Sequence, residues 1–190
     1  MADKRPLMFD EKQNISQVLR GNLEAFGSLV KEYQQLVFHV IATVVKIHAD
    51  KQDVSQEVFI KVYKNLHSFH FQSRLSTWIA AIAYRTALNY VRDRPKESSI
   101  DNIAFLETIP VTDLDPVTLA EKKDLNNYIQ RLVLQLPAQY RIILVLYHVD
   151  EFSYLEIADI LGMPEGTVKN YLFRARRLLK DKLKPYIKYE

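Results

Sequence analysis

A phenylalanine set among cations near the C-terminus is the most chemically specific feature of the sequence. If residues 165–184 form a helix, one face is polar and basic and the other is apolar. The polar face carries Lys169, Asn170, Phe173, Arg176, Arg177 and Lys180, with Arg174 at its edge, and the apolar face carries Val168, Leu172, Ala175, Leu179 and Leu183. Arg and Asn can hydrogen-bond to base edges or phosphates, and an aromatic ring can contact a thymine methyl group. The face therefore favours DNA binding; the alternative is an amphipathic surface helix with one exposed Phe173.

The residues leading into this helix have the spacing of a DNA-binding helix-turn-helix. Counting position 154 as the first, Ala158 stands fifth, Gly162 ninth and Val168 fifteenth. A small residue lets the second helix cross the first, glycine suits a turn with positive φ, and the valine is a buried contact. Pro164 suits the first turn of the second helix, where its missing N–H has no cost. This pattern predicts a helix-turn-helix.

A second group of side chains suits unpaired bases. Residues 69–78, FHFQSRLSTW, bring three aromatic residues and a histidine around a short polar loop. On the helix expected after the loop, one stripe carries Trp78, Arg85, Asn89 and Arg92. Aromatic rings stack on unpaired bases, and Arg and Asn side chains can hydrogen-bond to them. Burial of the aromatic residues in a helical core is the alternative.

The helix expected over residues 51–66 has one exposed apolar residue in a polar face. Asp53, Gln56, Glu57 and Lys64 surround Ile60 on the side opposite the core positions. An apolar centre with a polar rim is typical of a small protein contact. A solvated face with a stray isoleucine is the alternative.

Composition excludes several classes of function. Cysteine is absent, which excludes a disulfide scaffold, a thiolate zinc site and a cysteine nucleophile. The five histidines are scattered, and neither a glycine-rich phosphate loop nor a nucleophile motif occurs. We therefore expect no metal, no cofactor and no enzymatic activity.

The sequence predicts a cytoplasmic protein without membrane insertion. Its N-terminal residues are charged, and its apolar run over 36–45 is too short to span a bilayer.

Periodicity and charge divide the chain into two helical domains. Residues 1–95 and 117–190 are the expected domains, and residues 96–116 form a proline-containing acidic linker. The C-terminal segment 166–190 holds 8 basic residues against 2 acidic ones, although the formal net charge of the chain is only +3. Helices are expected over 14–32, 34–48, 51–66, 75–93, 117–135, 138–149, 154–161 and 165–184, with a possible break at Gly21 and a capping box from Ser153 to Glu156. The predicted fold class is all-α.

Five stretches, in this order, resemble the bacterial extracytoplasmic-function (ECF) sigma factors, the promoter-specificity subunits of RNA polymerase. They are GNLEAFGSLVKEY (21–33), DVSQEVFIKVYKNLHSF (53–69), STWIAAIAYRTALNYVR (76–92), LPAQYR (136–141) and FSYLEIADILGMPEGTVKNYLFRAR (152–176). The resemblance covers most of both expected domains. It implies that the partners are core RNA polymerase and promoter DNA, both as duplex and as the non-template single strand. Since many members are held inactive by an anti-sigma factor, such a protein is a further candidate partner.

The resemblance also implies residue roles. Core polymerase would be bound by Asp53, Gln56, Glu57, Ile60 and Lys64. The −10 element would be bound by Phe69, His70, Phe71, Gln72, Ser73, Arg74, Trp78, Arg85, Asn89 and Arg92. The −35 element would be bound by Gly166, Thr167, Lys169, Asn170, Phe173, Arg174, Arg176 and Arg177.

Two departures from the family pattern leave the preferred −10 base open. Arg85 stands where Asn is frequent, and the loop reads HFQS where many members have Arg-Gly-Glu/Asp-Ser. The alternative function is a stand-alone helix-turn-helix regulator whose N-terminal domain senses a partner. That alternative explains neither the aromatic loop nor the face around Ile60.

Overall fold

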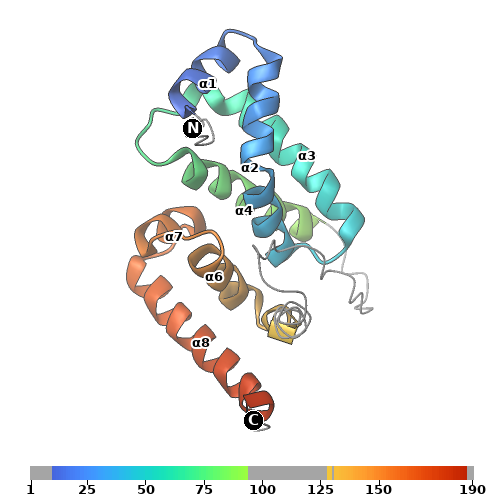
Figure 1. Cartoon of the computed structure of the whole chain (residues 1–190), viewed down its shortest axis with the longest axis vertical. Helices are drawn as coiled ribbons and strands as arrows, with labels where there is room; N and C mark the ends of the chain where they lie inside the picture. The colour runs from blue at the N-terminus through green and yellow to red at the C-terminus, as the bar shows by residue number, and fades with distance from the viewer. Residues whose placement is uncertain (1–9, 94–127, 130, 188–190) are drawn as a thin grey trace, which may run out of the picture.

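The computed structural model describes residues 10–93, 128–129 and 131–187, and it is helical throughout the regular part of these ranges (Figure 1). The helices are α1 (Glu11–Leu19), α2 (Leu23–Val44), α3 (His48–Asn65), the short 3-10 helix η1 (Leu66–Ser68), α4 (Leu75–Asp93), α6 (Ala138–His148), α7 (Tyr154–Leu161) and α8 (Glu165–Ile187). The all-α prediction is confirmed. The expected linker, residues 96–116, lies outside the described residues. No described helix is both long and apolar enough to span a bilayer.

The first helix boundary differs from the prediction. We expected helices over 14–32 and 34–48, whereas α1 ends at Leu19 and α2 runs unbroken through position 33. Gly21 turns the chain with a φ of 88°, and the Asn22 side chain then accepts hydrogen bonds from the N–H groups of residues 24 and 25. This N-cap satisfies two of the free donors of the first turn, so the helix begins here. Nothing at position 33 interrupts the helical hydrogen bonds, and the expected break there is wrong.

Helices α1–α4 form an N-terminal group with α2 at its centre. Leu29, Val37 and Ile41 of α2 are fully buried, and α1, α3 and α4 all pack against this helix. On α4 the buried residues include the small Ala80, Ala83 and Ala87, which let the helices approach closely. Apolar burial contributes about 25 cal/mol per Å², so this core is the main source of stability for the group.

Helices α6–α8 form a C-terminal group that contains the helix-turn-helix. The Ser153 hydroxyl caps α7, and the Glu156 side chain accepts a hydrogen bond from the Ser153 N–H at 2.9 Å, so the predicted capping box is confirmed. Gly162 ends α7 with a φ of 66°, and its N–H donates to the Ala158 carbonyl. Val168 is fully buried. Each residue of the spacing argument therefore has its expected conformation or burial.

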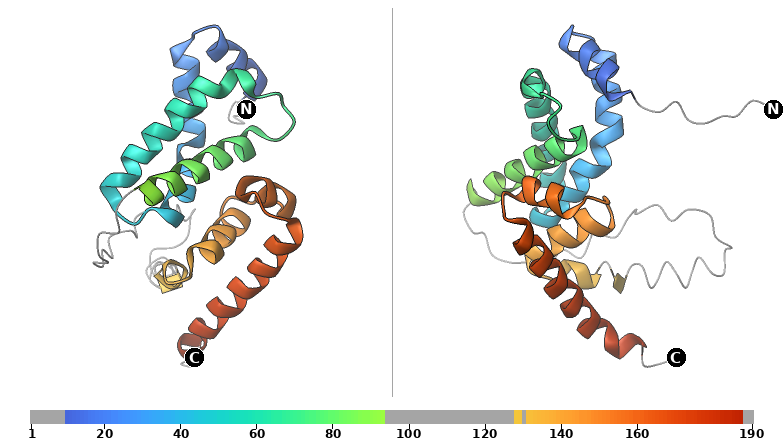
Figure 2. Two further views of the ribbon diagram at one scale, coloured as in Figure 1. Left: turned by 180° about the vertical axis from the view of Figure 1, so that it is seen from behind. Right: turned by 90° about the vertical axis from the view of Figure 1, so that its left-hand side faces the viewer.

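The two groups pack against each other, with α7 against α4 and α6 against α2 (Figures 1 and 2). At one end the Glu156 carboxylate accepts hydrogen bonds from Thr77 at 3.3 Å and from Arg74 at 3.4 Å. At the other end His39 Nδ1 lies 2.8 Å from an Asp150 carboxylate oxygen, and burial raises the pKa of that carboxyl despite the histidine. No local sequence pattern predicts these contacts, because each joins residues 79 or more positions apart.

Candidate DNA and polymerase interfaces

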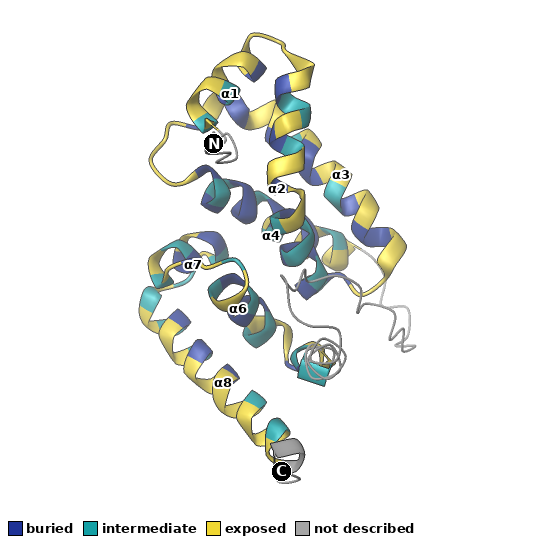
Figure 3. Cartoon of the chain, viewed as in Figure 1, coloured by how far each residue is buried: buried dark blue, intermediate teal, exposed yellow. Residues whose placement is uncertain are grey.

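The polar face of α8 is exposed to solvent, as the helical wheel predicts, and its apolar face is buried in the first half of the helix, while Leu179 and Leu183 are half-buried. Val168, Leu172 and Ala175 are buried against the rest of the C-terminal group. The exposed side carries Lys169, Asn170, Phe173, Arg174, Arg176 and Arg177, and Gly166 near its start is exposed while Thr167 is half-buried. The Phe173 side chain is 66% exposed. Figure 3 shows α8 exposed along most of its length beyond α6 and α7. A cationic ridge with one unburied ring is therefore available to a ligand.

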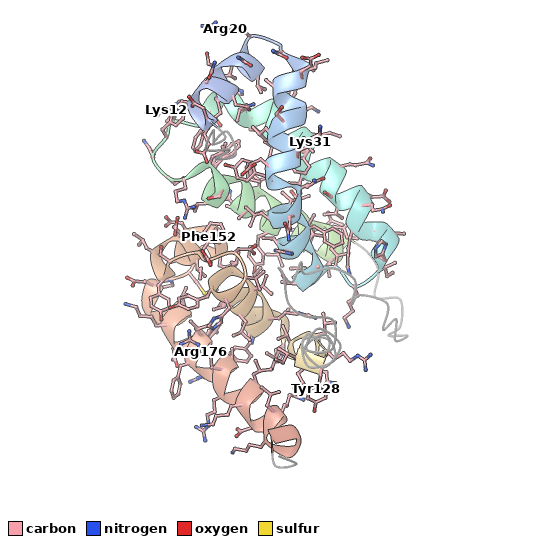
Figure 4. The ribbon with its side chains drawn as sticks, in the orientation of Figure 1. Lys12, Arg20, Lys31, Tyr128, Phe152 and Arg176 are labelled. Atoms are coloured by element: carbon pink, nitrogen blue, oxygen red, sulfur yellow. The ribbon has the colours of Figure 1, made fainter. Side chains whose placement is uncertain are left out.

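Two cations of this face contact aromatic residues from other helices, and one of them, Lys169, is also paired with Glu165 of α8 at 2.6 Å. The Arg176 guanidinium, whose place on α8 is labelled in Figure 4, lies 5.0 Å from the centre of the Tyr147 ring. Its Nε donates to Nε2 of His148 at 3.2 Å. The ammonium of Lys169 lies 5.5 Å from the Tyr154 ring centre. Tyr147 and Tyr154 stack on each other with ring centres 5.1 Å apart. Sequence reasoning missed these positions because no spacing within α8 points to α6.

His148 must be neutral to accept the hydrogen bond from Arg176. Partial burial and then the Arg176 charge lower the pKa of the His148 imidazole. The neutral ring has a free nitrogen lone pair, whereas the protonated ring has none and would repel the guanidinium. The local electrostatics thus keep Arg176 fixed near neutral pH.

The aromatic loop contains one buried ring and one exposed ring. Phe69 is 7% exposed and contacts the rings of Phe71 at 4.9 Å and Trp78 at 5.4 Å. Phe71 is 49% exposed, and Trp78 is half-buried. The predicted core alternative therefore holds for Phe69, while Phe71 faces solvent. The other loop residues of the predicted set, His70, Gln72, Ser73 and Arg74, are exposed.

The predicted polar stripe continues from this loop along α4. Arg85, Asn89 and Arg92 are all exposed, and their spacing of four and three residues puts them on one side of the helix. Arg92 is paired with Asp93 at 3.2 Å. At about 1.5 Å per residue, Arg85 lies roughly 10 Å along the axis from Trp78. The stripe is thus long enough to follow several nucleotides of an extended strand.

The α3 face is arranged as the sequence predicts. Ile60 is 53% exposed, and Asp53, Gln56, Glu57 and Lys64 around it are exposed, while Val54, Val58 and Val62 on the other side are buried. Glu57 pairs with Lys61 at 2.7 Å. Tyr63, 41% exposed and in edge-on contact with Phe26 at 4.9 Å, extends the apolar centre of this face. Its place one helical turn after Ile60 was the signal that sequence reasoning passed over.

Within the described ranges, no group of three or more His, Asp or Glu side chains could hold a metal ion.

Comparison with known proteins defines the class. The family model Sigma-70 region 2 matches residues 29–97, which include most of the N-terminal group. The family model Sigma-70, region 4 matches residues 126–179, which include the helix-turn-helix. This chain belongs to the ECF RNA polymerase sigma factors, which direct promoter-specific initiation of transcription.

Relatives match over nearly the whole chain. The ECF sigma factor SigW of Bacillus subtilis is 30% identical over 180 residues, covering 91% of this chain and 96% of that protein. The ECF sigma-E factor of Escherichia coli K12 is 35% identical over 181 residues, covering 92% and 94%. The resemblance inferred from five sequence stretches is therefore confirmed.

Two solved structures share the fold. CnrH, solved in complex with the cytosolic domain of CnrY, superposes with a TM-score of 0.64 at 20% identity, covering 92% of this chain and 97% of that one. The sigma factor RpoE of Bartonella quintana, solved with the anti-sigma factor NepR, has a TM-score of 0.67 at 23% identity, covering 84% and 96%. These likenesses support the arrangement of helices described above.

Proposed function

We propose that promoter recognition is divided between two domains with different DNA substrates. Residues 1–95 bind core RNA polymerase and the unpaired −10 element, residues 117–190 bind the −35 element as duplex, and residues 96–116 link them. The two family matches, 29–97 and 126–179, support this division. The chain acts by binding alone, in the cytoplasm, and supplies no covalent chemistry.

The observation that carries the −35 assignment is the exposed Phe173 among cations on α8. The exposed Phe173 ring lies on the polar face of α8 between Lys169 and Arg176, where it packs against no hydrophobic core. A large apolar side chain in this setting needs an explanation other than folding. In the major groove such a ring can contact a thymine methyl group while the neighbouring cations bind guanine or phosphates. The proposed contacts are Gly166, Thr167, Lys169, Asn170, Phe173, Arg174, Arg176 and Arg177.

The −10 assignment is supported by the exposed loop and by the stripe along α4. A base taken out of the duplex loses stacking worth a few kcal/mol, and stacking on an aromatic side chain returns about 1–3 kcal/mol per base. The half-buried Trp78 and the exposed Phe71 offer rings beside Arg74, and Arg85 and Asn89 offer hydrogen bonds further along. Phe69, which is buried, supports the loop from beneath.

The face around Ile60 is proposed to bind core polymerase. An exposed isoleucine surrounded by Asp53 and Glu57 suits a partner with an apolar centre and a basic rim. An anti-sigma factor is a further proposed partner. The likeness to the sigma factor RpoE, solved with the anti-sigma factor NepR, supports it.

Run-off transcription with purified core polymerase on a panel of promoters tests the proposal. The double variant Asp53→Lys with Glu57→Lys should lose both core capture and transcripts, since like charges across an interface cost several kcal/mol. Both carboxylates are exposed, so the melting temperature should stay nearly constant. Asp181→Lys, the same reversal on an exposed residue of α8, is the control and should capture core normally. A folded double variant that captures core as well as the parent would overturn the assignment of this face.

A further inference from the structure

Phe71 has a backbone conformation that aromatic residues rarely adopt. Its φ is 56°, in the left-handed region where the Cβ of an L residue crowds the following carbonyl. Glycine takes this conformation freely. Many ECF sigma factors have glycine at this position, as the second residue of the Arg-Gly-Glu/Asp-Ser loop. The Phe71 ring is also 49% exposed. Neither backbone preference nor burial therefore accounts for a phenylalanine here.

The neighbours of Phe71 hold its ring at the surface. Its centre lies 4.9 Å from that of Phe69, which in turn contacts Trp78 at 5.4 Å. Phe69 is the buried middle ring of this series, Trp78 is half-buried, and Phe71 is the most exposed. Because Phe71 packs on the buried Phe69, its ring is held in place before any ligand arrives.

A cation from another helix completes the arrangement. Lys12 of α1 places its ammonium 5.9 Å from the centre of the Phe71 ring. Figure 4 shows Lys12 extending from α1 on the side of the loop between η1 and α4. The neighbouring carboxylate, Glu11, accepts a hydrogen bond from the Tyr33 hydroxyl at 2.6 Å, and that of Glu156 is paired with Arg74. The Tyr33 hydroxyl holds the Glu11 carboxylate at α2 without neutralising it, and the charged group that lies over the exposed Phe71 ring is the Lys12 ammonium.

A flat apolar surface beside a positive charge fits one nucleotide of a single strand. The base presents a face that stacks on any aromatic ring, and the phosphate presents the anion. We propose that Phe71 stacks on an unpaired base of the non-template strand and that Lys12 binds the phosphate beside that base. This inference rests on the proposed −10 function of the loop and adds α1 to the DNA-binding surface.

Stacking distinguishes bases weakly, because every base has a π face. Phe71 thus raises the affinity for opened DNA without choosing the base that the loop captures. A strained backbone at a binding site is retained when the side chain it displays is needed there. We therefore expect that the Phe71 ring is needed for binding opened DNA. A variant without the ring should lose affinity for opened DNA without a loss in the free energy of unfolding.

Three substitutions of Phe71 separate the ring from the fold. Phe71→Tyr keeps a ring, Phe71→Asn tolerates positive φ without a ring, and Phe71→Gly removes the strain as well. The assay measures the affinity of holoenzyme for a fork-junction promoter fragment whose −10 bases are unpaired, and for a fully duplex −35 fragment. The Asn and Gly variants should lose about 5- to 150-fold on the fork junction, the range of one base–aromatic stack. The Tyr variant should stay within about twofold, since its ring stacks equally well.

The melting temperatures and the duplex fragment give the refuting results. The Asn and Gly variants should melt no lower than the parent and bind the −35 duplex normally. Full affinity of both variants for the fork junction would overturn the proposal. So would a fall in their melting temperatures with equal losses on both fragments, because Phe71 would then support only the fold.

Lys12 is tested through the salt dependence of fork-junction binding. Lys12→Gln should reduce the slope of log affinity against log salt by about one, and Lys12→Arg should keep it. Lys31→Gln is the control, because Lys31 is an exposed cation of α2 on another side of the same helical group (Figure 4). An unchanged slope for Lys12→Gln would remove Lys12 from the site. If the parent holoenzyme does not prefer the unpaired −10 fragment to its duplex form, the proposed −10 function itself fails. If the parent has this preference and the Phe71 variants keep it, only the stacking inference fails.

Discussion

Replacing Tyr147 with leucine should weaken binding to the −35 element although Tyr147 lies on α6. Its ring supports the Arg176 guanidinium from 5.0 Å, and the next residue, His148, accepts a hydrogen bond from Arg176 Nε. Without the ring, Arg176 has more rotamers to lose when it binds DNA, and ordering such a side chain opposes association. Leucine keeps an apolar side chain at this half-buried position, so α6 stays packed.

The expected magnitude follows from the geometry. A cation–π contact at this exposure is a weak one, and its loss corresponds to about two- to fivefold in affinity. Adding His148→Ala removes the hydrogen bond as well and should bring the loss to roughly 30-fold. Arg176→Ala sets the upper limit, because a positioning residue cannot contribute more than the contact it positions.

Fluorescence anisotropy of holoenzyme on a labelled promoter duplex measures these affinities across a salt series. In a double-mutant cycle, Tyr147→Leu should have no further effect once Arg176 is alanine. Tyr140→Leu is the matched control, because Tyr140 is also a half-buried tyrosine of α6 but contacts Tyr171. Equal losses from Tyr147→Leu with and without Arg176 would refute the positioning role.

Further predictions concern pH, turns and caps. The pKa of His148 is lowered in the folded protein, so promoter affinity should be full above about pH 6.5 and should fall as the pH drops through that lowered pKa. His148→Gln does not titrate and should flatten this pH profile in the same anisotropy assay. Gly162→Ala should cost about 1–2 kcal/mol in urea unfolding, because the added Cβ meets open space but φ is 66°. Asn22→Ala should cost about 1 kcal/mol, measured the same way, because two N–H groups lose their acceptor. Glu156→Gln keeps a capping residue but loses the ion pair with Arg74 and one carboxylate oxygen that accepts from Thr77, so thermal unfolding should show a loss of about 1 kcal/mol.

Local sequence patterns predicted most of the C-terminal group. The capping box at Ser153, the left-handed Gly162 and the buried face of α8 each depend on residues a few positions apart, and periodicity detects such relations. The expected helices, 14–32 and 34–48, were divided at position 33, but the chain breaks at Gly21 instead, because the Asn22 cap starts α2 at Leu23. Here one side chain with two hydrogen bonds decided the boundary.

Contacts between helices distant in sequence were beyond prediction. The sequence predicts Arg176 as a contact to the −35 element, but it does not predict that Tyr147 and His148 of α6 hold the side chain. Similarly, Phe69 and Phe71 have the same residue type and lie two positions apart, but one is buried and the other exposed. Only the tertiary fold, which determines where the loop meets Trp78, separates their roles.

The packing of α4 against α7 can be compared with the distance between the two promoter elements along DNA. Elements named −35 and −10 lie about 25 base pairs apart, roughly 85 Å along straight B-form DNA at ~3.4 Å per step. Thr77 and Glu156, in contrast, are joined by a hydrogen bond of 3.3 Å. On the proposed division of labour, the packed form cannot reach both elements, so each round of initiation includes the separation of α7 from α4 and of α6 from α2. By linkage, any ligand that favours the packed form lowers promoter affinity by the same factor by which the promoter lowers the affinity for that ligand. The free energy of this interface therefore adds to the binding free energy that polymerase and promoter must supply before transcription starts.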